Sequence, residues 1–151
     1  MLITGCDNKS GFGFKTASAL ICRGFRVLAC CYDANAATKV SHALKAIARA
    51  HEIKEDHVRT LVVDVRSDES VTACVAAAQK YASSSGSTLW SLVNNAGVQS
   101  GALVDWTSLD DYKVQPLNQG WVMLRKLTPE TPNLTEQRAH RFAWASIFSV
   151  S

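Results

Sequence analysis

The sequence predicts an α/β fold in which helices cover a parallel sheet. Two observations support this class. Short apolar runs alternate with segments whose apolar residues recur at helical spacing, and the run at residues 25–32 is continuous apart from Arg26, as in a strand buried on both faces. The chain has 151 residues, of which 47% are hydrophobic and 19% are charged. These proportions are typical of one compact domain and exclude a disordered chain.

Strands and helices are predicted in a regular order along the chain. Four apolar runs are predicted strands: residues 2–3, 25–32, 58–65 and 89–93. Three amphipathic segments between them are predicted helices: residues 14–21, 40–47 and 71–78. A further helix is expected to begin near Thr107 or Ser108, because acidic residues follow these N-cap residues. Residues 114–151 have no assignable period.

Composition and charge exclude several classes of protein. Sixteen Lys and Arg residues against thirteen Asp and Glu give a net charge of +3 without a basic tract, which argues against a nucleic-acid partner. No run of eighteen apolar residues and no signal peptide is evident, so the sequence predicts a soluble, intracellular and, as written, cytoplasmic chain. The five cysteines lack a C-x-x-C pair and the four histidines lack zinc-ligand spacing, which predicts buried free thiols and no metal site.

Residues that follow the predicted strands are the candidates for ligand binding, because open α/β sheets bind ligands beyond the carboxyl ends of their strands. Residues 4–13 combine glycines with a helix start, as a pyrophosphate site requires, although an ordinary glycine turn explains them equally well. A P-loop is disfavoured, because Asn8 stands where that motif needs a glycine. Asp33 lies twenty residues after Gly13, which suits ribose binding, and a solvated loop aspartate is an equal alternative.

Two further motifs follow the third and fourth predicted strands, namely Asp64-Val65 and Asn94-Asn95-Ala96-Gly97. Together with the loop from Thr4-Gly5 to Gly13, they resemble the short-chain dehydrogenase/reductase family. The motifs Arg23-Gly24-Phe25 and Trp90-Ser91-Leu92-Val93 resemble its retinol, 17β-hydroxysteroid and 3-hydroxybutyrate dehydrogenase subgroup. The resemblance covers residues 1 to about 113. It implies a Rossmann-type, doubly wound parallel sheet that is truncated in its C-terminal half.

The family resemblance also implies an activity and a set of cofactor contacts. The activity is hydride transfer between NAD or NADP and a small-molecule alcohol or ketone such as a retinoid, a hydroxysteroid or a 3-hydroxy acid. Three groups of residues would contact the cofactor: Gly5, Gly11, Phe12 and Gly13 at the pyrophosphate, Asp64 and Val65 at the adenine, and Asn94, Ala96 and Gly97 at the ribose. A helix cap near Ser67 is the alternative role for Asp64. NAD is slightly favoured, because the Asp33 carboxylate would repel the 2′-phosphate of NADP.

The sequence departs from the family pattern at three places. Five residues separate Gly5 from Gly11 where the family has three, so two residues between them are expected to bulge outward. The helical asparagine of the family has no match, because Asn118 precedes its glycine by two positions instead of three. The catalytic Tyr-x-x-x-Lys is absent, since residues Ala36, Ser85 and Pro116 stand four places after the three tyrosines. Ser151 is a candidate for the catalytic serine, against the alternative of an ordinary chain-end serine.

These departures lead to an expectation about the chain as a whole. Residues 1–151 are expected to form a partial dinucleotide-binding domain, with 114–151 as a divergent or mispredicted end. Without the tyrosine and lysine that handle the proton, the fragment is expected to be inactive. A non-catalytic module that binds a dinucleotide or a partner is the alternative. For a longer form, homo-oligomerisation and a membrane-associated or mitochondrial location stay open.

Overall fold

A four-stranded parallel sheet forms the centre of the computed structural model, which describes residues 1–97. Its strands are β1 (Leu2–Ile3), β2 (Val27–Cys31), β3 (Val58–Val62) and β4 (Leu92–Val93). They lie in the order β3-β2-β1-β4, and every neighbouring pair is parallel. The predicted α/β class with a parallel sheet is therefore confirmed.

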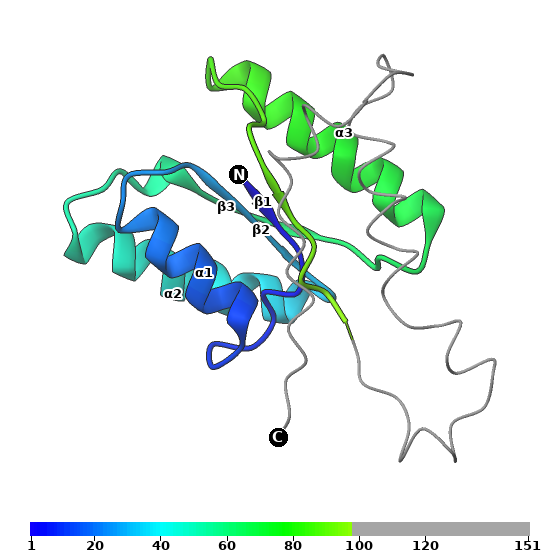
Figure 1. Ribbon diagram of the computed structural model, residues 1–151, viewed down its shortest axis with the longest axis horizontal. Helices are drawn as coiled ribbons and strands as arrows, with labels where there is room; N and C mark the ends of the chain where they lie inside the picture. The colour runs from blue at the N-terminus through cyan, green and yellow to red at the C-terminus, as the bar shows by residue number, and fades with distance from the viewer. Residues whose placement is uncertain (98–151) are drawn as a thin grey trace, which may run out of the picture.

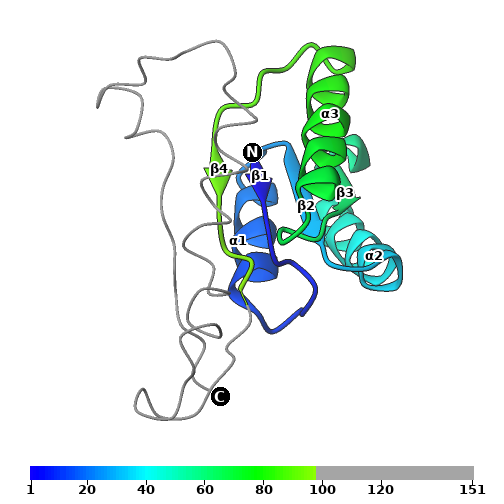
Figure 2. The same ribbon diagram turned by 90° about the vertical axis from the view of Figure 1, so that its right-hand side faces the viewer.

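Helices cover both faces of this sheet (Figures 1 and 2). On one face lie α1 (Phe12–Ile21) and α2 (Ala34–Ala50), and on the other lies α3 (Asp68–Ser84). A short 3-10 helix, η1 (Glu55–His57), precedes β3. Because the crossovers run on both faces, the sheet is doubly wound, as the family resemblance implied.

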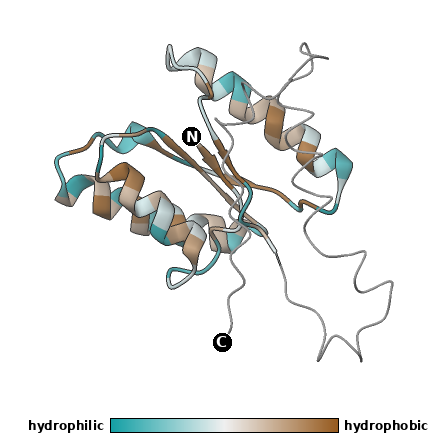
Figure 3. Ribbon diagram, in the orientation of Figure 1, coloured by the Kyte–Doolittle hydropathy of each residue, from teal (hydrophilic) through white to brown (hydrophobic). Residues whose placement is uncertain are grey.

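The core consists of two apolar layers, one on each face of the sheet. Side chains of β2 alternate between them: Val27, Ala29 and Cys31 pack with α1 and α2, whereas Leu28 and Cys30 pack with α3. All five residues of β2 are buried, so the strand is apolar throughout (Figure 3). This double burial is the physical reason for the continuous apolar run at this position.

Three observed strands are shorter than predicted, and of the run at residues 89–93 only Leu92–Val93 forms a strand. The run at residues 25–32 yields a strand only from Val27, because Gly24 and Phe25 close the end of α1. Gly24 has a φ of +82°, and the Phe25 N–H donates to the Leu20 carbonyl. The run at residues 58–65 stops at Val62, because Asp64 begins the turn into α3. The helix expected near Thr107 or Ser108 and the end at residues 114–151 lie outside the described residues.

Four of the five cysteines are buried, as predicted for free thiols, and Cys22 is exposed. The Sγ atoms of Cys30 and Cys74 lie 3.8 Å apart between β2 and α3. Burial raises the pKa of the Cys31 thiol to about 12, so this side chain is a neutral apolar group at physiological pH. Among the helices of residues 1–97, none is long and apolar enough to cross a membrane.

Candidate functional site

The candidate site lies where the direction of the chain crossovers reverses. The crossovers through α1 and α2 build the sheet outward from β1 to β3, and the crossover through α3 returns the chain to the other side of β1. The reversal therefore falls between β1 and β4. In open α/β sheets, ligands bind at such a point beyond the carboxyl ends of the strands. The loop between β1 and α1 lies at this end of the sheet (Figure 2).

Thr4 and Asn95 join the ends of β1 and β4. The Thr4 hydroxyl oxygen accepts hydrogen bonds from the backbone N–H groups of Asn95 and Ala96, at 3.0 and 2.9 Å. In return, the Asn95 amide nitrogen donates to the carbonyl oxygens of Thr4 and Gly5, both at 3.0 Å. Thr4 is 1% exposed and Asn95 is half-buried, so these bonds are partly shielded from water.

Sequence reasoning assigned no role to Thr4 or to the Asn95 side chain. The available signal was a threonine directly after one predicted strand and an asparagine pair directly after another. Their position shows that this part of the Asn94–Gly97 motif links the two strand ends.

Gly5 and Gly13 are required by close contacts across the same strand ends. Gly5 has a φ of +70°, and a Cβ at this position would lie 2.7 Å from the Ala96 Cα. A Cβ on Gly13 would lie 2.3 Å from the Gly5 carbonyl oxygen and 2.7 Å from the Asn95 amide nitrogen. The structure thus gives Gly13 a packing role against Gly5, in addition to its predicted place at a pyrophosphate.

The N-terminus of α1 begins at the carboxyl end of β1. Gly11 is its N-cap residue, and no side chain caps the helix. By contrast, α2 and α3 are capped by Asp33 and Ser67, whose side chains accept from the backbone N–H groups of Ala36 and Ser70. Helix N-terminal N–H groups without a side-chain acceptor are suited to bind an anion. Phe12, the first residue of α1, is 45% exposed beside them.

The long loop between Gly5 and Gly11 forms an exposed turn. The Gly11 N–H donates to the Asn8 carbonyl at 2.9 Å, and the Ser10 N–H donates to the Asn8 side chain at 2.9 Å. Before this turn, the Asp7 carboxylate accepts from the backbone N–H of Tyr32 at 2.5 Å. Asp7 therefore connects the loop after β1 to the end of β2.

Asp33 has a defined structural role as well as its predicted functional one. Its carboxylate accepts from the Ala36 N–H at 2.9 Å and begins α2, and the side chain stays exposed. From the sequence, a ribose contact and a solvated loop position were equal alternatives for Asp33. The cap places the carboxylate at the end of β2 without excluding either interpretation.

Asp64 is paired with Arg66 at the end of β3. The Arg66 Nε and Nη2 atoms donate to Asp64 Oδ1 and Oδ2 at 2.9 and 2.8 Å, and the Arg66 backbone N–H donates to Oδ1 at 3.0 Å. This guanidinium lowers the pKa of the Asp64 carboxyl below its ordinary value. Asp64 does not cap α3, because Ser67 holds that position. Arg66 was not singled out from the sequence, although a basic residue two places after a turn aspartate was visible there.

The remaining predicted residues either follow the carboxyl ends of β3 and β4 or lie outside the described residues. Val65 packs against the α3 side of the core. Asn94 and Ala96 are half-buried and Gly97 is exposed after β4. Ser151 lies outside the described residues. The expected cofactor contacts of all these residues stay predictions.

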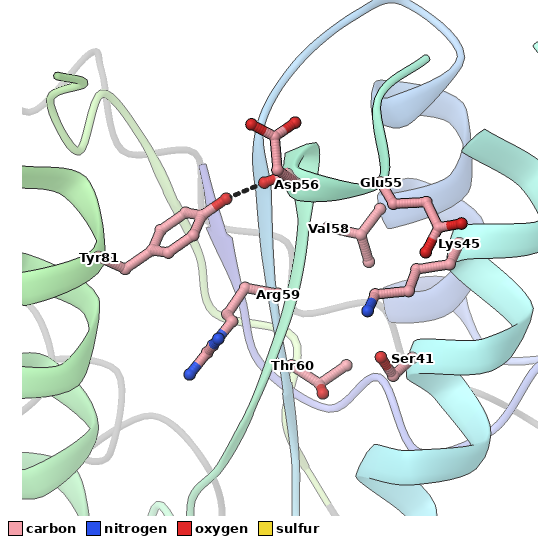
Figure 4. A pocket seen from close by; sticks show the side chains of 8 residues that line it. All are labelled: Ser41, Lys45, Glu55, Asp56, Val58, Arg59, Thr60 and Tyr81. Atoms are coloured by element: carbon pink, nitrogen blue, oxygen red, sulfur yellow. Dashed lines mark hydrogen bonds between the residues drawn. The ribbon is translucent and has the colours of Figure 1, made fainter. Parts of the chain in front are cut away.

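A cavity of about 370 Å³ lies elsewhere, along the outer edge of β3 (Figure 4). Ser41 and Lys45 of α2 border it on one side of the strand, and Arg59 and Tyr81 lie on the other. The Tyr81 hydroxyl donates to the carbonyl of Asp56, another of its lining residues. Because its lining residues belong to the side edge of the sheet, this cavity is separate from the strand ends where the predicted cofactor residues lie.

The strand order and the two-sided crossovers define a Rossmann-type α/β protein. The chain belongs to the short chain dehydrogenase family, which matches residues 1–117. Of solved structures, the Pseudomonas aeruginosa RhlG/NADP active-site complex has a TM-score of 0.67 at 24% identity, covering 85% of this chain and 46% of that one. At this identity the likeness shows the fold alone.

Three curated relatives match the same part of the chain. The mouse (Mus musculus) mitochondrial D-beta-hydroxybutyrate dehydrogenase is 35% identical over 113 residues, covering 75% of this chain. The mouse 17-beta-hydroxysteroid dehydrogenase type 6 and retinol dehydrogenase 7 are 36% and 34% identical, each over 74% of this chain. The chain spans 31% of the length of each relative. These are the three enzyme classes that the sequence motifs resemble, so the predicted family is confirmed.

Proposed function

We propose that the whole protein is an NAD(P)-dependent oxidoreductase acting on an alcohol or ketone, and that the residues described here bind its dinucleotide. Membership of the short chain dehydrogenase family supports the reaction class. The names of the relatives support a 3-hydroxy acid, a hydroxysteroid or a retinoid as the substrate class. When bound, the nicotinamide supplies or accepts the hydride. The part played by residues 1–97 is to hold and orient the dinucleotide.

The uncapped N-terminus of α1 carries this proposal. Within residues 1–97, α2 and α3 begin with side-chain caps and α1 does not. Its N–H groups lie at the carboxyl end of β1, where the absence of a side chain at Gly5 and Gly13 lets the strand end and the helix approach each other closely. A pyrophosphate bound there would accept hydrogen bonds from the helix and gain from its dipole.

A charged cap on α1 tests the pyrophosphate site. Gly11→Asp would place a carboxylate at the N-cap, where it competes for the same N–H groups and repels the pyrophosphate. Gly11 has a φ of −74°, which any residue adopts, but a Cβ there would lie 3.1 Å from the Asn8 carbonyl oxygen, so any side chain at residue 11 requires this exposed loop to shift by a few tenths of an ångström. We expect Gly11→Asp to weaken NADH binding at least about tenfold, a cost of about 1.4 kcal/mol. Gly11→Ala is the matched control and should retain binding within about threefold, which is below 1 kcal/mol.

The measurement is an NADH titration followed by cofactor fluorescence, with the 151-residue chain attached to a soluble carrier protein. Gly11→Asp should unfold at a denaturant concentration equal to or above that of Gly11→Ala, because both variants share the contact of the new Cβ and only the aspartate caps α1. Lost binding with retained stability therefore identifies competition for the helix N-terminus. Equal NADH affinity of Gly11→Asp and the native chain would remove the pyrophosphate from this site.

We also expect a modest preference for NAD over NADP. The Asp33 carboxylate lies at the end of β2, and it would repel a 2′-phosphate on the adenosine ribose. At a separation of about 5 Å in water, one charge pair is worth about 0.8 kcal/mol, and a phosphate carries nearly two charges. Lys9 in the preceding loop is the opposing cation.

Asp33→Asn separates the charge of this residue from its capping role. Asparagine caps a helix as well as aspartate does, so α2 should keep its stability. We expect the ratio of NADPH to NADH affinity to rise about tenfold in this variant, which corresponds to about 1.4 kcal/mol. Tighter binding of NADPH than NADH by the native chain would show that Lys9 outweighs Asp33.

A second candidate function is a module that binds a dinucleotide or a partner without turnover. One observation favours it: none of the three tyrosines of the 151 residues is followed four places later by a lysine. The 151-residue chain should then quench NADH fluorescence and show no NAD-linked oxidation of 3-hydroxybutyrate, a hydroxysteroid or retinol. Measurable turnover would reject this candidate and show that another residue handles the proton.

A further inference from the structure

The Arg66 side chain connects the ends of β2 and β3. Besides its two contacts to the Asp64 carboxylate, its Nη2 atom donates to the Tyr32 hydroxyl at 2.9 Å. The centre of the guanidinium lies 5.4 Å from the centroid of the Tyr32 ring. Tyr32 is 57% exposed, and its backbone N–H is held by Asp7. The result is an exposed pair of flat side chains beside the predicted adenine position.

The contacts of Arg66 fix which carboxylate oxygen of Asp64 stays available. Oδ1 accepts two hydrogen bonds from Arg66, one from its backbone and one from Nε, whereas Oδ2 accepts one from Nη2. Each carboxylate oxygen has about two acceptor positions. Oδ1 is therefore saturated within the described contacts, and Oδ2 retains one position. A fork of two parallel bonds also restrains the orientation of the carboxylate more than a single contact would.

A ligand that uses this arrangement should combine a flat aromatic ring with an N–H donor. The exposed Tyr32 ring and the Arg66 guanidinium both stack well on aromatic faces. The free acceptor position of Asp64 suits an amino group rather than a carbonyl oxygen, which a carboxylate repels. Adenine has this combination through its exocyclic amino group. Hypoxanthine has the same ring shape with a carbonyl oxygen in place of that group.

We propose that Arg66 is a positioning residue that sets the base specificity of the dinucleotide site, by holding Asp64 with one oxygen ready for the adenine amino group. The inference rests on the proposed dinucleotide function and deepens it. Tyr32 serves as the second contact of the guanidinium and as a support for the base. Removing Arg66 frees the carboxylate to rotate, so the site loses its discrimination between an amino group and a carbonyl.

The experiment compares NADH with reduced nicotinamide hypoxanthine dinucleotide, whose base carries a carbonyl oxygen in place of the amino group and a proton on the adjacent ring nitrogen N1. Both dissociation constants are measured by fluorescence titration of the carrier-attached 151-residue chain. We expect the native chain to bind NADH about tenfold more tightly than the hypoxanthine form. In Arg66→Gln the preference should fall to threefold or less, mainly through weaker NADH binding. The preference should fall equally in Arg66→Lys, because lysine keeps the positive charge but cannot donate two parallel hydrogen bonds to the carboxylate.

A control variant separates this role from general effects of charge and fold. Arg59→Gln removes an exposed arginine of β3 whose side chain has no hydrogen bond or ion pair among residues 1–97, and it should keep the tenfold preference. A purely structural role of Arg66 would weaken both dinucleotides equally and leave the ratio unchanged.

The possible results distinguish the inference from the function on which it rests. If the native chain binds neither dinucleotide, the proposed function fails and the inference with it. If it binds NADH and Arg66→Gln keeps the native base preference, only the inference is overturned. Tighter NADH binding by Arg66→Gln would also overturn it, because Arg66 would then compete with the base for Asp64.

Discussion

Replacing Gly13 by alanine should destabilise the protein, although glycine-to-alanine changes in helices usually stabilise. Gly13 is the second residue of α1, and a Cβ there would lie 2.3 Å from the Gly5 carbonyl oxygen. Overpacking of this kind costs about 1–3 kcal/mol. The same Cβ would lie 2.7 Å from the Asn95 amide nitrogen, whose two hydrogen bonds are worth about 1 kcal/mol each. Alanine returns only about 0.5–1 kcal/mol of helix propensity. The net loss should be about 2–4 kcal/mol, which reaches beyond the roughly 0.5–3 kcal/mol that most destabilising substitutions cost.

The assay is pulse proteolysis in a urea series, which reads the folded fraction of the chain while a soluble carrier remains attached. Ala19→Gly is the matched control, because residue 19 is an exposed position of the same helix and reports propensity alone. It should lose about 0.5–1 kcal/mol. Alanine is thus expected to be unfavourable at residue 13 and favourable at residue 19. A Gly13→Ala chain as stable as the native one would refute the close contact between α1 and the loop after β1.

Three further predictions use other parts of the strand ends and the core. Thr4→Val leaves two backbone N–H groups of the segment after β4 without their acceptor, so it should cost about 1–3 kcal/mol in the same assay. Thr4→Ser keeps the hydroxyl and should lose less than half as much. Arg66 lowers the Asp64 pKa, so this carboxylate should stay charged below pH 3.8 and lose its pairing only as the pH falls through the lowered pKa. In Arg66→Gln, a carbon-13 NMR titration should find the Asp64 pKa higher than in the native chain. Maleimide should modify Cys22 before any other cysteine, because the other four are buried. Modification of two or more thiols at equal rates would contradict the described core.

The order of strands and helices was readable from the sequence because each element has a simple burial pattern. The buried face of α2 shows helical spacing through Val40 and Leu44, and β2 is apolar at every position. Element ends were less predictable. Phe25 is apolar and looks like a strand residue, yet its N–H closes the α1 end after Gly24. A hydrophobic side chain does not reveal whether its backbone belongs to a ladder or to a helix cap.

The site was predictable only in its position, since the glycine loop and the asparagine motif both follow predicted strands. The partners within it were not predictable, because they come from segments far apart in the chain. Asn95 contacts Thr4 and Gly5 across about ninety residues, and Arg66 contacts Tyr32 across 34. Sequence spacing assigns a role to one residue at a time. These hydrogen bonds depend on the register of four strands, which only the folded sheet defines.

The long loop after β1 shows which part of the glycine motif the fold needs. The two residues beyond the family spacing lie in a stretch that ends in the exposed Asn8–Gly11 turn, while the Cys6 N–H still pairs with the Cys30 carbonyl and extends the β1 ladder. Gly5, before the turn, and Gly13, after it, still approach each other closely. Loop length costs little free energy, because closure entropy rises slowly with the number of residues. A Cβ at either glycine would lie closer to its neighbours than van der Waals contact allows, and the repulsion energy rises steeply at such distances. The fold therefore tolerates a change in the number of residues between the glycines of the motif. It does not tolerate a side chain where the first glycine, Gly5, meets the last, Gly13.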